Sequence, residues 1–141
     1  MRLDVDTVVS NHSFLQARRA AQTVCTAVDR LYEASVSNST VRNVFCVVRP
    51  PGHHIGTSGP VKNPNNANVT QGFCLLNNVA IAAAYARSKY ACFSRIAIVD
   101  LDIHHGNGTE DCILHLNPCK STSKITAENL QLKYVEKKRY S

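Results

Sequence analysis

Two short apolar runs, each ending in a cluster of ionisable residues, constrain the fold of this sequence most strongly. The runs occupy 44–48 and 96–99 and are rich in β-branched residues, a pattern typical of strands buried in a parallel sheet. The Ala-rich segment 76–90 between them predicts a helix that begins near Asn77 or Asn78. A strand, a helix and a second strand in this order predict a right-handed crossover and a layered α/β fold.

Further elements are expected on both sides of this unit. Apolar residues recur at three- and four-residue steps over 14–33, which predicts a helix, and another helix is expected to begin at Glu110. Residues 55–71 are rich in Gly, Pro, Asn and Ser and predict a long loop. Two interpretations of this loop are equally open: a role at a functional site and a solvated insertion. The pattern over 126–136 fits either a strand or the start of a helix.

The composition excludes several classes of protein. The chain has 141 residues, 44% hydrophobic and 18% charged, which matches one globular domain rather than a fibrous or disordered chain. No run approaches the roughly 18 apolar residues of a membrane-spanning helix, and the first residues lack the apolar stretch of a signal peptide. The net charge of +6 lies partly in 121–141 and accompanies no known motif. We therefore expect no direct nucleic-acid or membrane binding.

The second apolar run leads into a cluster that can bind a metal ion. Alternate residues of an extended chain face the same side, so Asp100, Asp102 and His104 are expected to point together. Carboxylate oxygens and imidazole nitrogens are good ligands for zinc, iron or manganese. The alternative is a helix-capping Asp with a core His, which three ionisable residues in phase disfavour.

The first apolar run leads into adjacent histidines. Prolines and a glycine over 50–52 end the strand where a parallel sheet opens its ligand crevice, and His53 and His54 follow. A histidine beside a metal-bound water is a natural general base, and Asp100 is the candidate carboxylate for orienting its ring. The stretch Gly72-Phe73-Cys74 is no functional signal by itself, since a core Phe with a buried Cys at a helix start is the better explanation.

Taken together, these stretches resemble the zinc-dependent histone deacetylase family, which has the arginase/deacetylase fold. The residues that carry the resemblance lie in 49–54, 71–83 and 98–110. The resemblance implies a three-layer αβα architecture with a central parallel sheet, present here only in part. It makes 1–118 a partial deacetylase domain, with the N-terminal part and the later catalytic part missing, and leaves 119–141 as a basic tail.

The resemblance also implies a role for matching residues. His53 and His54 are implied to be the tandem active-site histidines, with His54 favoured as the general base and Asp100 paired with His53. Asp102 and His104 are implied to be two of the three protein ligands of Zn²⁺, and the third is expected to be absent from the chain.

Three further implications concern the substrate channel, a second ion and the branch of the family. Gly72 and Phe73 are implied to line the channel that takes the acetyl-lysine side chain. A structural K⁺ is implied beside the zinc, with oxygen ligands from the segment that holds Asp100, Asp102 and His104. Asn107 resembles the class II branch, and its amide cannot supply the charge that a carboxylate would supply to His54.

The implied activity is hydrolysis of the acetyl amide of acetyl-lysine in histones or other proteins. We expect the chain as given to be an incomplete, inactive piece, because Asp111 lies too close to His104 to replace the third ligand. The alternatives are an amidohydrolase of acetylpolyamines or other small acetylated amines and a non-catalytic truncated regulatory fragment. The expected partners are acetyl-lysine proteins and corepressor-type complexes, and the expected location is the nucleus or also the cytoplasm.

Overall fold

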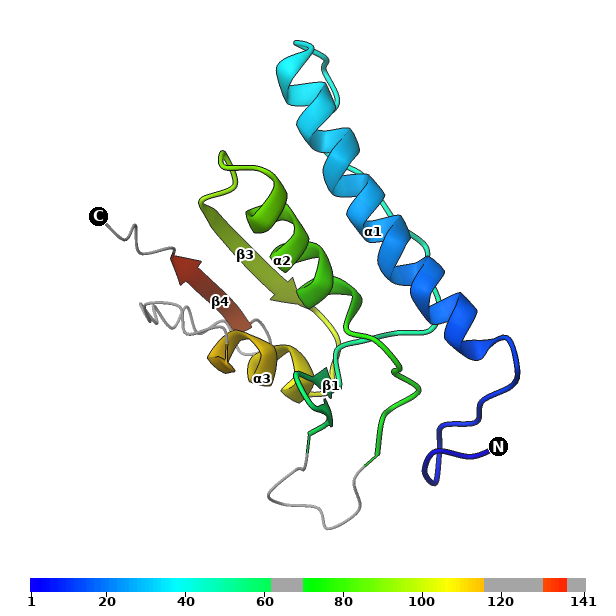
Figure 1. The fold of residues 1–141 in the computed structure, drawn as a ribbon. Helices are drawn as coiled ribbons and strands as arrows, with labels where there is room; N and C mark the ends of the chain where they lie inside the picture. Colours follow the sequence, from blue (N-terminus) through cyan, green and yellow to red (C-terminus); the bar gives the residue numbers. More distant parts are fainter. Residues whose placement is uncertain (62–69, 116–130, 137–141) are drawn as a thin grey trace.

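The computed structural model describes residues 1–61 and 70–115 and the backbone of 131–136 (Figure 1). The other residues, which include part of the predicted loop over 55–71 and most of the tail over 119–141, lie outside this description. In chain order the elements are α1 (Ser13–Val36), β1 (Ile55–Gly56), β2 (Gly59–Pro60), α2 (Asn78–Lys89), β3 (Arg95–Asp100), α3 (Asn107–His115) and β4 (Gln131–Glu136).

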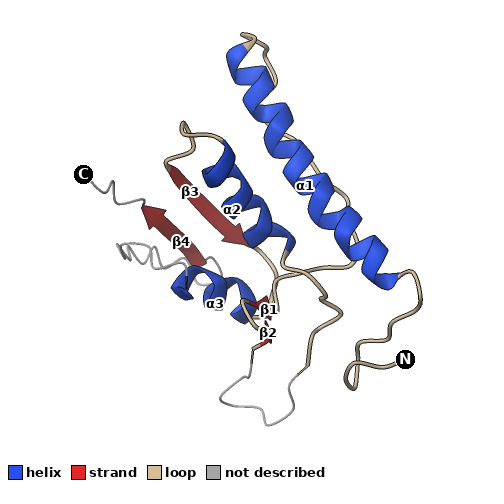
Figure 2. Cartoon of the chain, in the orientation of Figure 1, coloured by secondary structure: helices blue, strands red, loops and turns tan. Residues whose placement is uncertain are grey.

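Helices α1 and α2 pack side by side (Figure 2). The buried positions of both helices are mostly alanines, which let the two backbones approach closely: Ala17, Ala20, Ala21 and Ala34 in α1 and Ala80, Ala82 and Ala86 in α2. Asp29 of α1 also accepts hydrogen bonds from Tyr85, Lys89 and Tyr90 at the end of α2. The helices predicted over 14–33 and 76–90 are therefore confirmed, with small differences at their ends.

Asn77 joins three elements and fixes the start of α2. Its side-chain oxygen accepts a hydrogen bond from the backbone N–H of Ala80 at 3.1 Å, which is the predicted N-cap contact. Its amide nitrogen donates to the backbone oxygen of Ile55 and to the hydroxyl of Thr109, at 2.9 and 3.1 Å. Asn77 is only 4% exposed, so this buried amide holds β1 and α3 against the start of α2.

The described strands pair antiparallel. β1 and β2 form a small hairpin, and β3 pairs with β4 from Arg95 opposite Glu136 to Asp100 opposite Gln131. The strand predicted over 96–99 is confirmed within β3, and part of 126–136 forms the strand β4. The chain is thus a mixed α/β structure, and the expected central parallel sheet is not formed among the described strands.

The strand predicted over 44–48 is wrong. These residues belong to no strand, and the side chains of Phe45 and Val47 are 91% and 87% exposed. A strand exists through hydrogen bonds to a neighbouring strand, and β3 pairs with β4 instead. The apolar composition of this run therefore marks a segment suited to burial, without supplying the neighbour that would bury it.

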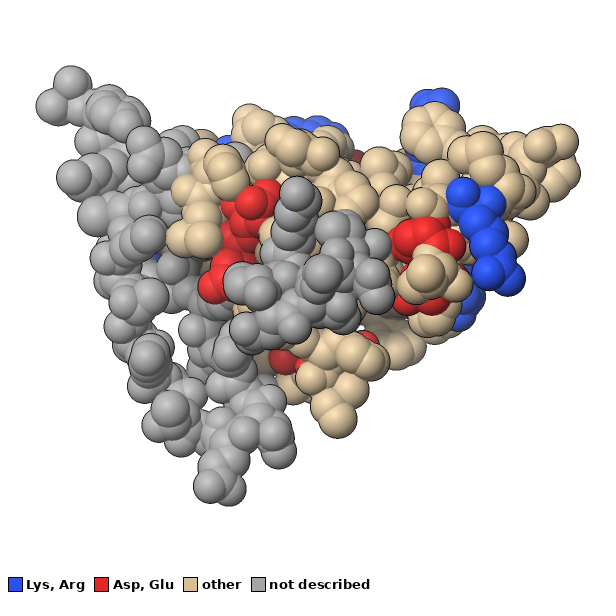
Figure 3. Space-filling model, turned by 90° about the horizontal axis from the view of Figure 1, so that it is seen from below, with Lys and Arg blue, Asp and Glu red and all other residues tan. Residues whose placement is uncertain are grey.

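Three further observations bear on the expectations from composition. None of the described helices is both long enough and apolar enough to cross a membrane. The five cysteines in the described residues are free. Seen from below, the visible acidic side chains form small separate patches, with Lys and Arg mostly at the edge of the face (Figure 3).

Candidate active site

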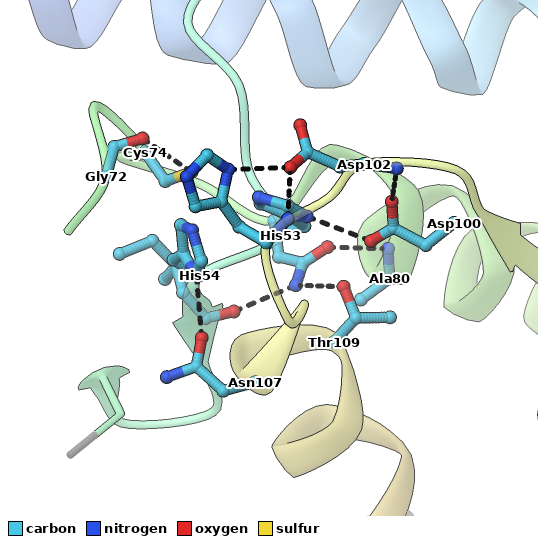
Figure 4. A network of polar contacts seen from close by, with 12 residues as sticks. His53, His54, Gly72, Cys74, Ala80, Asp100, Asp102, Asn107 and Thr109 are labelled. Atoms are coloured by element: carbon cyan, nitrogen blue, oxygen red, sulfur yellow. Dashed lines mark hydrogen bonds and ion pairs between the residues drawn. The ribbon is translucent and has the colours of Figure 1, made fainter. Parts of the chain in front are cut away.

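The candidate site residues come from distant parts of the chain and meet beside the start of α3 (Figure 4). His53 and His54 precede β1, Asp100 ends β3, and Asn107 begins α3. The backbone N–H of Thr109 donates to the backbone oxygen of His53 at 3.0 Å. This contact attaches the segment of His53 and His54 to the first turn of α3, which also contains Asn107, the partner of His54.

His53 is paired with the carboxylate of Asp100. Nδ1 of His53 donates to Oδ2 of Asp100 at 2.9 Å, and their side chains are 18% and 34% exposed. Gly106 makes room for this pair, since a Cβ there would lie 2.6 Å from Oδ2 of Asp100. The carboxylate can orient the ring and stabilise a positive charge on it, which leaves Nε2 of His53 as the free ring nitrogen.

His54 is paired with the amide of Asn107. The amide nitrogen of Asn107 donates to the backbone oxygen of Val61 at 3.0 Å, so its oxygen faces Nδ1 of His54, at 2.7 Å. Because an amide oxygen only accepts, Nδ1 of His54 must carry the proton. The lone pair then lies on Nε2, which is the arrangement that a general base requires.

Gly72 lies against the second histidine, and Phe73 follows it in the chain. Their φ angles are +51° and +65°, in the left-handed region, and a Cβ on Gly72 would lie 2.3 Å from Cδ2 of His54. Only glycine permits this approach of the backbone to the ring. Phe73 is 54% exposed and lines a cavity of about 440 Å³ that also contacts Thr7 and Pro50. The two histidines do not line this cavity, so it lies beside the site.

Cys74 lies beneath this segment. It is fully buried, and its thiol donates to the backbone oxygen of Gly72 at 3.4 Å. Burial raises the pKa of the Cys74 thiol, so this sulfur behaves as a small packed group rather than as a nucleophile.

Asp102 and His104 contact each other. Oδ1 of Asp102 accepts hydrogen bonds from the backbone N–H and from Nδ1 of His104, at 2.7 and 2.8 Å. These two bonds lower the pKa of the Asp102 carboxyl. The side chains are 47% and 72% exposed, and Asp100 accepts from the backbone N–H of Asp102 at 3.0 Å. The pair is therefore accessible from solvent and joined to the first histidine through Asp100.

The donor chemistry of Asp102 and His104 suits zinc, and the set is incomplete. A carboxylate and an imidazole are both ligands that zinc prefers, and catalytic zinc sites have three protein ligands. Within the residues that the structure describes, no group of three or more His, Cys, Asp and Glu side chains could hold a metal ion. Coordination of a metal through Nδ1 of His104 would require that nitrogen to lose its proton.

Sequence reasoning missed two residues that support this site. Asp4 accepts a hydrogen bond from the backbone N–H of Gln71, and the hydroxyl of Thr7 accepts one from the backbone N–H of Phe73. The available signal was local, since Asp followed three residues later by Thr is typical of a side-chain-capped turn. Nothing in that signal indicates which distant segment the turn contacts.

Comparison with known proteins finds a matching family and similar chains. The family model described as "Histone deacetylase domain" matches residues 1–125. "Type-2 histone deacetylase 2" of Dictyostelium discoideum is 50% identical over 108 residues, which are 77% of this chain and 6% of that protein. An uncharacterized protein of Synechocystis is 41% identical over 127 residues, covering 83% of this chain and 36% of that protein.

A third relative differs in the substrate that its name states. A "Polyamine deacetylase" of Danio rerio is 46% identical over 78 residues, which are 55% of this chain and 10% of that protein. Two further relatives have names that include "chloroplastic". This chain spans a minor part of the length of each of these relatives, so the similarity concerns one segment of their domains.

Proposed function

Since this chain belongs to the histone deacetylase family, we propose that it supplies part of the active site of a zinc-dependent hydrolase. The substrate is the acetyl amide of acetyl-lysine in histones or other proteins. The observation that carries the proposal is the grouping of two differently paired histidines beside two metal-ligand side chains. The ring centroids of His53 and His54 lie 4.2 Å apart, and those of His54 and His104 lie 6.2 Å apart.

Asp102 and His104 would hold the zinc ion, with a third protein ligand from outside the described residues. Zinc, when bound, would polarise the acetyl carbonyl and make a bound water more acidic. The K⁺ site at Asp100, Asp102 and His104 rests on the family resemblance alone.

The two histidines divide the proton chemistry according to their partners. Nε2 of His54 carries the lone pair and takes the proton of the attacking water, because Asn107 holds the proton on Nδ1. His53 has a carboxylate behind it, so its ring can hold a positive charge and deliver a proton from Nε2 to the leaving amine. One neutral and one anionic partner thus support opposite roles for neighbouring rings.

Gly72 and Phe73 would form one wall of the channel for the lysine side chain. The backbone at Gly72 packs against His54, and the half-exposed ring of Phe73 offers an apolar face to an aliphatic chain. An acetylated polyamine has the same aliphatic chain and acetyl amide, and the zebrafish relative's name states a polyamine substrate. This is the second candidate substrate. Corepressor-type partners and a nuclear or cytoplasmic location complete the proposal.

Release of acetate by the native protein tests the proposal. The protein is captured from its source with an antibody to residues 55–71, and acetate is measured with an acetyl-lysine histone peptide or with acetylspermidine. Zinc-dependent release from the peptide is expected, and release from acetylspermidine alone would favour the polyamine substrate. No release from either would contradict an enzymatic role and favour a non-catalytic fragment.

Variants of the same protein test the assigned base. His54→Gln is expected to reduce the rate at least about 100-fold, since general base catalysis contributes at least that factor. His115→Ala is the matched control, because His115 is 63% exposed and, among the described residues, its hydrogen bond and ion pair are with Asp111 of the same helix. An equal loss in both variants would contradict the role of His54.

A further inference from the structure

The turn over 4–7 holds a segment that is distant in the chain. Oδ1 of Asp4 accepts the backbone N–H groups of Asp6 and Thr7 at 3.0 and 2.7 Å, and its other oxygen accepts the N–H of Gln71. The hydroxyl of Thr7 donates to Asp6 at 2.8 Å and accepts the N–H of Phe73 at 3.2 Å. Both carboxylate oxygens of Asp4 are thus used, one within the turn and one across to Gln71.

The segment held by this turn has an uncommon conformation. Gly72 and Phe73 both have positive φ angles, +51° and +65°, and a bulky residue such as Phe rarely adopts the left-handed region. A surrounding structure must therefore maintain it. The N–H groups of Gln71 and Phe73, on either side of Gly72, are the two that Asp4 and Thr7 bind. Thr7 is only 3% exposed, so its hydrogen bond is protected from water.

This conformation determines where the backbone meets the second histidine. A Cβ at Gly72 would lie 2.3 Å from Cδ2 and 2.9 Å from Nε2 of His54. The backbone therefore touches the edge of the ring that carries the proposed basic nitrogen. On its opposite side the ring is bound through Nδ1 to Asn107. His54 thus lies between α3 and the segment that the turn over 4–7 holds.

We propose that Asp4 and Thr7 are positioning residues of the active site: by binding the N–H groups of Gln71 and Phe73, they hold Gly72 against His54. Their effect on catalysis rests on the proposed function, while the contacts themselves do not. This arrangement is made by contacts within the chain itself. It can therefore be tested on the 141-residue chain by a structural measurement.

Amide hydrogen exchange and the ¹⁵N signals of the His54 ring measure the two ends of this connection. In Asp4→Asn one oxygen becomes an NH₂ group, which cannot accept the N–H of Gln71 while the remaining oxygen serves the turn. Exchange at Gln71 is expected to accelerate about tenfold, and the His54 ring signals to shift. Asp6→Asn is the matched control, because it removes the same charge and keeps the acceptor for Thr7.

A second pair of variants isolates Thr7. Thr7→Val keeps the shape and loses the acceptor, so exchange at Phe73 is expected to accelerate about tenfold, whereas Thr7→Ser keeps the hydroxyl and the protection. Amides of α1 and α2 that keep wild-type exchange show that the fold is intact.

Two results would overturn the proposal. One is wild-type exchange at Gln71 and Phe73 in both Asp4→Asn and Thr7→Val. The other is an equal disturbance of the His54 signals by Asp6→Asn. A failed acetate-release assay would leave these readings unchanged, so failure of the positioning role and failure of the proposed function are distinguishable.

Discussion

The two histidines and the two metal-ligand residues of the candidate site differ in how firmly the fold holds them. His53 is 82% buried by side-chain area and His54 is held from both sides, by Asn107 and by Gly72. Asp102 and His104 are bound mainly to each other, and the neighbouring Ile103 is 95% exposed. The chain thus holds both histidines firmly, while the segment with the two proposed metal ligands is held less firmly.

The largest expected effect comes from disturbing the firmly held region. A Cβ at Gly108 would lie 2.3 Å from the backbone of His54 and Ile55, and backbone atoms cannot move aside as a flexible side chain can. Gly108→Ala is expected to reduce the free energy of unfolding by about 3 kcal/mol. Urea unfolding followed by circular dichroism measures this change.

The matching substitution in the weakly held region is Ile103→Ala. Because the Ile103 side chain is almost fully exposed, the free energy of unfolding is expected to change by less than about 0.5 kcal/mol. Similar losses in Gly108→Ala and Ile103→Ala would remove the distinction between the two regions.

An effect smaller than that of Gly108→Ala is expected on acidification, because the turn over 4–7 supports the firmly held region. Partial burial raises the pKa of Asp4, but backbone N–H donors at Gln71, Thr7 and Asp6 outweigh it and lower the pKa from 3.8 to about 2. A carboxyl with a lowered folded pKa stabilises the fold above its unfolded pKa, and this contribution disappears as the pH falls through about 2.

The contribution of Asp4 is expected to be about 1 kcal/mol, because its partial exposure weakens the interaction. It is measured as the difference in the free energy of unfolding between wild type and Asp4→Asn. The measurement is made at pH 6 and at several pH values below about 4. The difference should shrink as the pH falls. A difference that stays constant over this range would contradict the role of the Asp4 carboxylate.

The sequence predicted the elements whose signals are local. The helical spacing over 14–33 and the cap at Asn77 depend on neighbours in the chain, and the structure contains both. The β-branched run at 96–99 forms a strand because β4 pairs with it. The run over 44–48 failed as a strand because strand formation depends on a distant partner. Apolar composition indicates where burial would be favourable and cannot indicate which segment provides it.

The same distinction applies to the candidate site. Alternation along an extended chain suggested that Asp100, Asp102 and His104 act together, but β3 ends at Asp100 and the carboxylates have different partners. The motif resemblance directed attention to the paired histidines. It assigned no role to Asp4 or Thr7, because their contacts span more than sixty residues and arise only from the tertiary fold.

The central claim is that Asp102 and His104 form a partial zinc site. Metal binding by the 141-residue chain tests this claim most directly. Zinc titration by calorimetry is expected to detect one weak site, because two protein ligands hold zinc less well than three. Asp102→Asn and His104→Ala should each abolish it, and His115→Ala should leave it unchanged. Zinc binding that survives both substitutions, or that is absent from the wild-type chain, would contradict the account.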